Sequence, residues 1–540
     1  MRLEEMQLHT SPFLERYSNG DSEVVRFFDY KAHHDKHEWT KRQQELKRYS
    51  FPRQGLTNYL FSYNDKIGSS SKTLDHIQKL NSPESLAVVG GQQAGLLTGP
   101  LLVIYKCIST IQLAKQAQKE LNVPVVPIFW IAGEDHDMDE INHVMVPKNN
   151  TAKKISLKAA SSVKSSASMW GWNKEDVKPW LKEVFRAFGE TAYTSDFLAE
   201  SERILEKSDS IVTFFAQLLS KWFADEGLIL LDSGDPEFKK LQSHILKDMI
   251  IKNRDIDGAF ISQTNELNKS GYRDPIEIQK NNAHMFYTKD NERILLYRSE
   301  DGFSSKENDF SISEAELLEE AVNHPEKFSN NVVTRPLMQE FMLPVLSFVA
   351  GPGEIAYWAV LGKVFHQFNR KMPILTPRLS FTLVTNRILE LMNSKKLTVK
   401  QVLENGTDDF KREWFASNRP IETNESIESV KAEFTVSYGK LLKLAEEIDS
   451  KLLPVADHNL KRILSEIDYI EQKMEQRVRK KVKEPLAEFD EIMLQLKPTE
   501  ILQERIWNIY QFTNEIGPQL IKQLLQYPYE FNGKHKIIYL

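Results

Sequence analysis

Short apolar runs recur at wide intervals through the first part of the chain, with helical patterns between them. The runs cover residues 85–89, 123–131, 227–232, 343–349 and 372–377. Each run is almost continuously apolar, which is typical of strands buried on both faces of a sheet. One helix is predicted over Leu101–Leu121, and apolar positions at 355, 358, 361, 365 and 368 predict another. Strands that alternate with helices predict an α/β fold with a parallel sheet.

Two intervals between these runs are too long for a simple crossover helix. Residues 138–225 contain a Ser/Ala-rich stretch between helical segments, and residues 236–335 are polar with short strands such as "RILLYRS". We interpret both as insertions into one sheet domain that covers residues 1–384. Its first 80 or so residues are polar, and their pattern predicts helices.

From about residue 385 strand patterns vanish, and residues 385–500 predict a separate helical domain. Apolar residues recur there every seven positions, at Leu453, Leu460, Ile467 and Met474. This seam predicts a helical hairpin or short coiled coil, or else a helix packed on its own domain, and Pro454 and Pro485 limit its length. Residues 501–540 regain aromatic side chains, so we expect them to pack back on the core.

Composition narrows the function. A chain of 540 residues is long enough for several domains, and 70 Lys and Arg against 76 Asp and Glu leave no basic excess for nucleic acid. No apolar segment reaches the roughly 20 residues of a membrane helix, so no membrane partner is expected. Cys107 is the single cysteine, which excludes an internal disulfide and indicates a cytoplasmic protein. It is either a buried apolar residue or a nucleophile.

The turn "GGQQAGLLTGP" after the first run is a candidate ligand site. Its polar and glycine residues are Gly90, Gly91, Gln92, Gln93, Thr98 and Gly99. Glycines let the backbone approach a ligand, and the amides of the following helix bind carboxylates or phosphates. The alternative is a tight strand-to-helix connection. Gln92 replaces the second glycine of a dinucleotide motif, and Leu96 and Leu97 replace the Lys and Ser/Thr of a P-loop.

Acidic residues and a histidine follow the second run. Asp135, His136 and Asp137 are candidate catalytic residues, because ligands of α/β sheets bind beyond the carboxyl ends of strands. His136 could serve as a general base or a metal ligand, and whether a metal binds is left open. The alternative is an acidic helix start with Asp135 or Asp137 as its cap. His33 and His37 also have a spacing that a metal could use, although a solvated helix explains them equally.

The last two apolar runs end in further candidate binding residues. The turn "GPGEIAYW" contributes Gly351, Gly353, Glu354 and Tyr357, which we expect to face the same crevice. Glu354 alternatively complements the dipole of its helix. Arg378, after the final run, could hold a substrate carboxylate with both nitrogens or form a structural salt bridge.

The stretches "GGQQAGLLTGPL", "FWIAGEDHDMDE", "GPGEIAYW" and "ILTPR" occur in this order. With the chain length and the helical C-terminal region, they resemble the cysteine-adding enzymes of bacillithiol biosynthesis over nearly the whole chain. The resemblance implies a Rossmann-like core with two connecting insertions and a coiled-coil domain that pairs subunits into a homodimer. It also implies a ligase that adds L-cysteine to the amine of glucosaminyl malate, the last step to bacillithiol.

Such an amide forms only from an activated cysteine, and the attacking amine must be neutral, which gives His136 or Asp137 a role as base. Lys106 lies about two turns into its predicted helix, so we expect it to be too far away to help unless the end of the helix is open. The core is similar to class I synthetases, yet their His-x-Gly-His and Lys-Met-Ser-Lys-Ser motifs are absent. The use of ATP and magnesium therefore stays open, and no cofactor is assigned.

Two other functions fit the same residues. One is a nucleotidyltransferase-like enzyme that acts on another small carboxylic acid, and the other is a non-catalytic scaffold whose coiled coil binds partners. The identity of the product separates the first from a ligase. Alanine substitution of His136 and Asp137 separates the scaffold, which should tolerate both changes.

Overall fold

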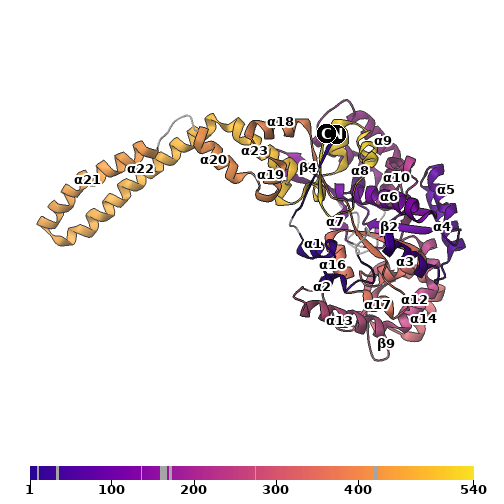
Figure 1. The fold of residues 1–540 in the computed structure, drawn as a ribbon. Coiled ribbons are helices and arrows are strands. Elements are labelled where there is room, and N and C mark those ends of the chain that lie inside the picture. Colours follow the sequence, from indigo (N-terminus) through magenta and orange to yellow (C-terminus); the bar gives the residue numbers. More distant parts are fainter. Residues whose placement is uncertain are drawn as a thin grey trace. The chain divides into compact units, whose positions relative to one another are not determined.

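The computed structural model describes residues 1–8, 11–31, 36–135, 137–157, 167–169, 173–273, 275–418 and 424–540. They form two compact units, residues 1–384 with 501–540, and residues 385–500. The first unit combines sheets with helices, and the described part of the second is helical throughout (Figure 1).

All five predicted apolar runs form strands of one sheet. They are β2 (Leu86–Gln92), β3 (Val125–Ile131), β6 (Ile229–Asp232), β12 (Val345–Ala350) and β13 (Ile374–Pro377). The strand order is β13-β12-β2-β3-β6, and every neighbouring pair is parallel, which confirms the predicted Rossmann-like sheet. The order reverses between β2 and β12, the kind of switch point beside which α/β proteins bind ligands.

Both faces of this sheet are covered, which accounts for the continuously apolar runs. Ile128 and Trp130 belong to the main core cluster on one face, together with Leu56 of α4 (Arg53–Lys66). Phe129, one position between them, packs on the other face against Phe215, with ring centroids 6.3 Å apart. Alternate side chains of a strand point to opposite faces, so a strand that is covered on both faces needs apolar residues at nearly every position.

The helix expected over residues 355–368 is two helices instead, α16 (Pro352–Trp358) and α17 (Gly362–His366). The Gln263 side chain lies at the break. Its amide nitrogen donates to the Ala359 carbonyl at 2.7 Å, and its oxygen accepts from the Lys363 N–H at 2.5 Å. Gln263 thus takes main-chain hydrogen bonds that a continuous helix would make internally, and the apolar spacing contains no sign of it.

The first insertion contributes a β-hairpin and helices. Its elements are α7 (Met138–Ile141), β4 (His143–Lys148), β5 (Thr151–Ser156), α8 (Lys174–Phe188), α9 (Thr194–Glu206) and α10 (Ile211–Trp222). Helix α7 begins directly after the acidic stretch that follows β3, so the insertion starts at the carboxyl edge of the sheet.

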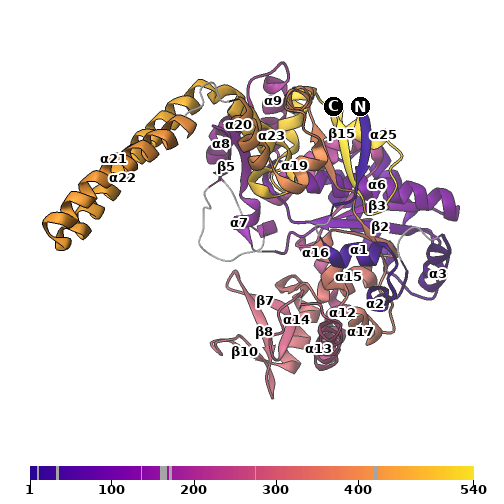
Figure 2. The same cartoon turned by 60° about the vertical axis from the view of Figure 1, so that its left-hand side comes forward.

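The second insertion builds a sheet of its own, with strand order β10-β9-β8-β7-β11 and antiparallel neighbours (Figure 2). Its elements are α11 (Pro236–Lys240), α12 (Ser243–Ile251), α13 (Asn253–Lys269), β7 (Asn282–Lys289), β8 (Glu292–Arg298), β9 (Gly302–Ser304), β10 (Ser311–Ser313), α14 (Glu314–Asn323), β11 (Phe328–Asn330) and α15 (Thr334–Met342). The strand predicted in "RILLYRS" is β8.

The two ends of the chain meet in a third sheet that the sequence did not predict. Strand β15 (His535–Tyr539) pairs antiparallel with β1 (Arg2–Met6) and parallel with β14 (Phe381–Val384), so the termini lie together (Figure 1). The expectation that residues 1–80 are helical is therefore wrong for β1. The helices there are α1 (Pro12–Ser18), α2 (Ser22–Val25), α3 (Lys36–Leu46), α4 and α5 (Ser71–Lys79).

Residues 501–540 belong to the first unit and contain α24 (Ile509–Ile516) and α25 (Leu520–Gln526). The Asn508 side chain donates to the Leu97 and Gly99 carbonyls at 2.7 and 2.8 Å. The C-terminal segment thereby supports the turn that precedes α6 (Leu101–Leu121), the helix predicted with these same bounds.

The second unit contains a long helical hairpin. Its helices are α18 (Asn386–Lys395), α19 (Val399–Asn405), α20 (Asp408–Asn418), α21 (Asn424–Ile448), α22 (Leu453–Lys481) and α23 (Lys483–Leu496). Helices α21 and α22 pack on each other, and Tyr438 donates to Asn459 at 2.7 Å between them. Pro454 and Pro485 stand in the first turns of α22 and α23, where proline is tolerated. None of the helices in the described residues has the length and apolar composition of a membrane span.

Candidate active site

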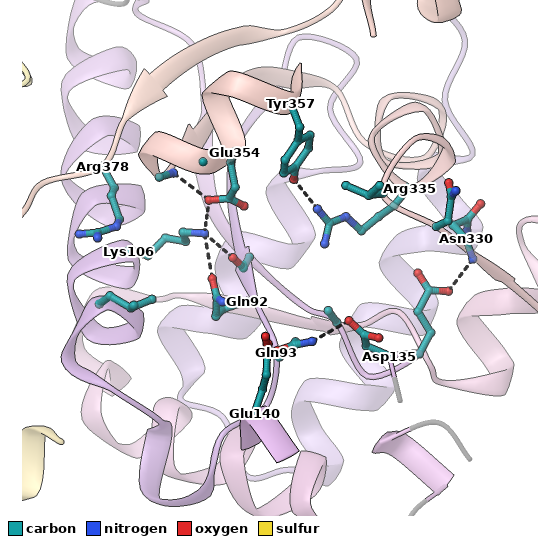
Figure 3. A pocket seen from close by; sticks show the side chains of 18 of the residues that line it. Gln92, Gln93, Lys106, Asp135, Glu140, Asn330, Arg335, Glu354, Tyr357 and Arg378 are labelled. Atoms are coloured by element: carbon teal, nitrogen blue, oxygen red, sulfur yellow. Dashed lines mark hydrogen bonds and ion pairs between the residues drawn. The ribbon is translucent and has the colours of Figure 1, made fainter. Parts of the chain in front are cut away.

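A cavity of about 740 Å³ lies beside the switch point of the parallel sheet, within the first unit. All four stretches that the sequence singled out contribute to its lining. The predicted residues that line it are Gly91, Gln92, Gln93, Asp135, Gly351, Gly353, Glu354, Tyr357 and Arg378. Figure 3 shows Lys106, Gln92 and Glu354 gathered toward one end and Arg335, Asn330 and Asp135 toward the other.

Lys106 makes the central contacts at the first end, although the sequence placed it out of reach. Its ammonium donates to the Gly91 carbonyl at 2.7 Å, the Gln92 side chain at 3.1 Å and the Glu354 carboxylate at 2.6 Å. Helical side chains lean toward the N-terminus, so Lys106 reaches back over the first turn of α6. Burial lowers the pKa of Lys106, and the Glu354 carboxylate opposes this shift. The lysine joins the first and third stretches through one partly buried ion pair.

Glu354 both caps its helix and faces the cavity. Its carboxylate accepts the Gly351 N–H at 2.7 Å and so caps α16, while the residue also lines the cavity. Tyr357, one turn later, accepts a hydrogen bond from the Arg335 guanidinium at 2.6 Å. Burial raises the pKa of Tyr357 to about 12, so this phenol stays neutral at physiological pH.

Three residues of the opening turn do not line this cavity, so the ligand contacts predicted for them stay a prediction. Gly90 packs beneath α6, where a Cβ would lie 2.4 Å from the Thr110 hydroxyl, so its role is close helix packing. Thr98 is fully buried, with φ of 74°. Gly99 instead borders a neighbouring cavity of about 390 Å³ that shares Gln92 and Gln93.

Arg378 lines the cavity, but the carboxylate that it binds with both nitrogens is a protein side chain and not a substrate. Its two terminal nitrogens donate to the Glu504 carboxylate at 2.9 and 2.5 Å, and both side chains are buried. Since the guanidinium fork is already occupied, the structural salt bridge that the sequence allowed is the arrangement found. The bridge ties β13 to the C-terminal segment.

Of the acidic residues predicted after β3, Asp135 lines the cavity and Asp137 does not. Asp135 lines the cavity, accepts from the Gln93 amide at 2.6 Å and lies 3.6 Å from the Arg293 guanidinium. Asp137 is exposed, lies outside the cavity lining, and its side chain does not cap α7. His136 lies outside the described residues.

Glu134 is the buried member of the same stretch. It is 4% exposed, lines the cavity, and accepts the Asn330 N–H at 3.2 Å. Burial raises the pKa of Glu134, while Lys239 and Arg293 oppose the shift. This carboxyl is therefore a better base candidate than its exposed neighbour Asp137.

One wall of the cavity comes from the second insertion, which the sequence did not connect with the site. Asn331 and Arg335 lie on this wall, beside Arg293 and Asn330. The Asn331 side chain accepts the Val333 N–H at 2.8 Å and contacts His284 at 3.2 Å. These residues occupy a polar stretch with no local motif, so only the tertiary fold brings them to the switch point.

His284 holds this wall from behind. Its Nε2 lies 2.9 Å from the Asp257 carboxylate and its Nδ1 lies 3.2 Å from the Asn331 amide nitrogen, so Nε2 is placed to donate to Asp257 and Nδ1 to accept from Asn331. His284 is 2% exposed and has φ of 57°, a conformation that few non-glycine residues adopt. The hydrogen-bonded chain fixes the loop between β11, which carries Asn330, and α15, which carries Arg335.

Cys107 stands apart from the cavity. Cys107 is fully buried in α6, and burial raises its pKa, as expected for an apolar core residue rather than a nucleophile. His33, half of the proposed metal pair, lies outside the described residues. Among the residues that the structure describes, no three His, Cys, Asp or Glu side chains come together as metal ligands.

Comparison with known proteins matches the whole chain. The family description "Bacillithiol biosynthesis BshC, N-terminal Rossmann-like domain" covers residues 1–379, and "Bacillithiol biosynthesis BshC, C-terminal coiled-coil domain" covers residues 381–540. Proteins named "Putative cysteine ligase BshC" from Bacillus licheniformis, Bacillus thuringiensis subsp. konkukian and Bacillus anthracis are 37% identical to it over 100% of both chains. Because the match includes the sheet, both insertions and the helical unit, the chain belongs to the BshC family of bacillithiol biosynthesis.

Proposed function

We propose that this chain is a ligase that joins L-cysteine to the amine of glucosaminyl malate, the last step of bacillithiol formation. The convergence of the four motif stretches on one cavity supports the proposal, in a chain that matches its named relatives from end to end. Its volume of about 740 Å³ falls within the roughly 300–1,000 Å³ of small-molecule sites. Since the product is a thiol, we place the enzyme in the reducing cytoplasm.

Arg335 is the residue that we assign to a malate carboxylate. Its Nε is buried and has no hydrogen-bond partner among the described residues, while a terminal nitrogen donates to neutral Tyr357. Figure 3 shows the Arg335 guanidinium between Tyr357 and Asp135. A buried guanidinium with an unused donor favours an anion, and a carboxylate fits its planar fork.

Substitution of Arg335 tests this assignment. We expect Arg335→Gln to raise the KM for glucosaminyl malate by about 10–100-fold, because a charge-assisted hydrogen bond to the carboxylate is lost. Arg254→Gln, an exposed arginine on α13, is the matched control. An unchanged KM in Arg335→Gln would contradict the assignment.

The reaction requires an activated cysteine, since a free carboxylate and an amine do not condense in water. The acyl carbon arrives as an acyl phosphate, an adenylate or a thioester, and the amine must lose a proton before it attacks. We test the activity by mass spectrometry of the purified chain with L-cysteine and glucosaminyl malate, with and without ATP and magnesium. A third mixture contains a cysteine thioester.

Bacillithiol formed only with ATP would identify the chain as a self-sufficient ligase. Product formed only from the thioester would assign activation to another enzyme and amide formation to this one. If no product forms in any of the three mixtures, the proposed function is contradicted.

We also propose that two copies pair through the helical hairpin α21–α22. Large apolar side chains on it are between 44% and 77% exposed, more than a soluble surface normally leaves uncovered. They include Val436, Leu441, Leu444, Ile448, Val455, Tyr469 and Met474. Light scattering should give the mass of a dimer for the wild type and of a monomer for Leu444→Glu/Ile448→Glu. Ile251→Glu, at an exposed site of the first unit, should remain dimeric, and a monomeric wild type would refute the pairing.

A further inference from the structure

We infer that Glu134 and Asn330 bind the amine of the acceptor substrate and that Glu134 is the base that takes its proton. The inference rests on the proposed function and assigns one step of it to named atoms. Sequence reasoning gave the role of base to His136 or Asp137.

Two buried oxygen atoms without donors carry the inference. Glu134 Oε1 and Asn330 Oδ1 have no hydrogen-bond partner among the described residues, although the two residues are only 4% and 5% exposed. Both residues line the cavity. Buried polar groups of native proteins are almost always paired, so two neighbouring orphan acceptors indicate a ligand that donates hydrogen bonds.

The two acceptors are held close to each other by the backbone. The Asn330 N–H donates to Glu134 Oε2 at 3.2 Å, which fixes the carboxylate and leaves Oε1 for a ligand. The Asn330 carbonyl in turn accepts from the Arg293 guanidinium at 3.2 Å. A primary amine can donate one N–H to each orphan oxygen, while its charge is compensated by the carboxylate.

The charges around Glu134 come from several elements. Lys239 of α11, Arg293 of β8 and Arg335 of α15 are its cationic neighbours. Lys239 also donates to the Glu326 carbonyl at 3.2 Å, and Arg293 lies 3.6 Å from Asp135. Both cations therefore interact with other oxygen atoms besides those of Glu134. Burial raises the pKa of Glu134 and the three cations oppose that shift, so the carboxyl is more basic than an exposed glutamate.

The proton balance suits amide formation. The acceptor enters as an ammonium ion and gives one proton to Glu134. The neutral nitrogen then forms the C–N bond with the acyl carbon of the activated cysteine, and the bond to the activating group breaks. A second proton leaves with that group, and one hydrogen stays on the amide nitrogen. The cysteine amine keeps its protons throughout, so the base belongs beside the acceptor.

Calorimetric titration of the full chain tests the site with two ligands, glucosaminyl malate and its N-acetylated form. The wild type should bind the free amine at least about tenfold more tightly, because acetylation removes the charge and two donors. Glu134→Gln should reduce this preference to below about threefold. Glu319→Gln, an exposed position on α14, should keep the full preference.

Further measurements guard against a misfolded variant. Asn330→Ala keeps the backbone donor to Glu134 but removes the orphan Oδ1, and it should also weaken the preference for the free amine. In the transfer reaction, the wild-type rate should rise with pH through the ionisation of Glu134, and this rise should disappear in Glu134→Gln.

The outcomes separate this inference from the proposed function. If the wild type binds both ligands equally, or Glu134→Gln keeps the preference, the amine site is wrong while the ligase proposal stands. The site is also misassigned if Glu134→Gln instead weakens discrimination between L-cysteine and N-acetyl-L-cysteine. If the wild type binds neither acceptor, the proposed substrate is wrong and the inference fails with it.

Discussion

Arg378 stabilises the first unit through its salt bridge, and its substitution should measurably destabilise that unit. The guanidinium forms two hydrogen bonds with Glu504, at 2.9 and 2.5 Å, between side chains that are 4% and 2% exposed. Removing one partner of a buried pair leaves an uncompensated charge and typically costs about 3–5 kcal/mol. Glu504 would keep donors from the Ser380 hydroxyl at 2.9 Å and the Phe381 N–H at 3.3 Å. We therefore expect Arg378→Met to lower the free energy of unfolding by about 3 kcal/mol.

Scanning calorimetry of the full chain should show this loss in the unfolding transition of the first unit. The double variant Arg378→Met/Glu504→Leu should recover most of it, because apolar side chains often replace a buried ion pair without net cost. Arg254→Met is the control for loss of an exposed arginine. A different result would refute the structural role: unchanged stability in Arg378→Met, together with a KM for glucosaminyl malate raised at least about tenfold, would show that the guanidinium serves the substrate.

Three other predictions follow from buried polar groups. Lys106→Met should lower kcat/KM by about 100-fold in the product assay, because Gln92 and Glu354 lose their common donor, while thermal stability falls by less than about 2 kcal/mol. His284→Asn keeps a residue type that tolerates positive φ but removes the hydrogen bond to Asp257, so the KM for glucosaminyl malate should rise. An unchanged KM would show that this wall of the cavity does not contribute to substrate binding. Burial lowers the pKa of His535 to about 4, so its contribution to stability is complete above about pH 6.5 and is lost as the pH falls toward 4. Unfolding at several pH values should show a loss of about 3 kcal/mol over this window, and the loss should be smaller in His535→Gln.

The parallel sheet could be predicted from sequence because each of its buried strands is a continuously apolar run. Runs such as 123–131 are apolar at both alternating positions, and only a strand covered on two faces needs this. Helix α6 was equally clear, since the apolar pattern runs from Leu101 to Leu121. Such signals are local, so one sequence is enough to detect them.

Elements that depend on distant partners could not be predicted in this way. The break between α16 and α17 is made by Gln263, about a hundred positions earlier, and the apolar spacing alone favours one helix. Strands β1 and β15 come from opposite ends of the chain, and each is short and partly polar. A two-ended sheet of this kind leaves no periodic pattern that distinguishes it from loop.

The candidate site divides along the same line. The sequence by itself determined that Gln92, Gln93 and Glu354 lie near one crevice, because turns after parallel strands meet at one edge of the sheet. Only the tertiary structure brought Asn330 and Arg335 to that edge, since they come from a polar insertion without a motif. It also decided protonation and pairing: burial shifts the pKa values of Lys106 and Glu134, and Glu504 occupies the fork of Arg378. Residue type sets which contacts are possible, but burial and distance, which arise only on folding, determine which ones form.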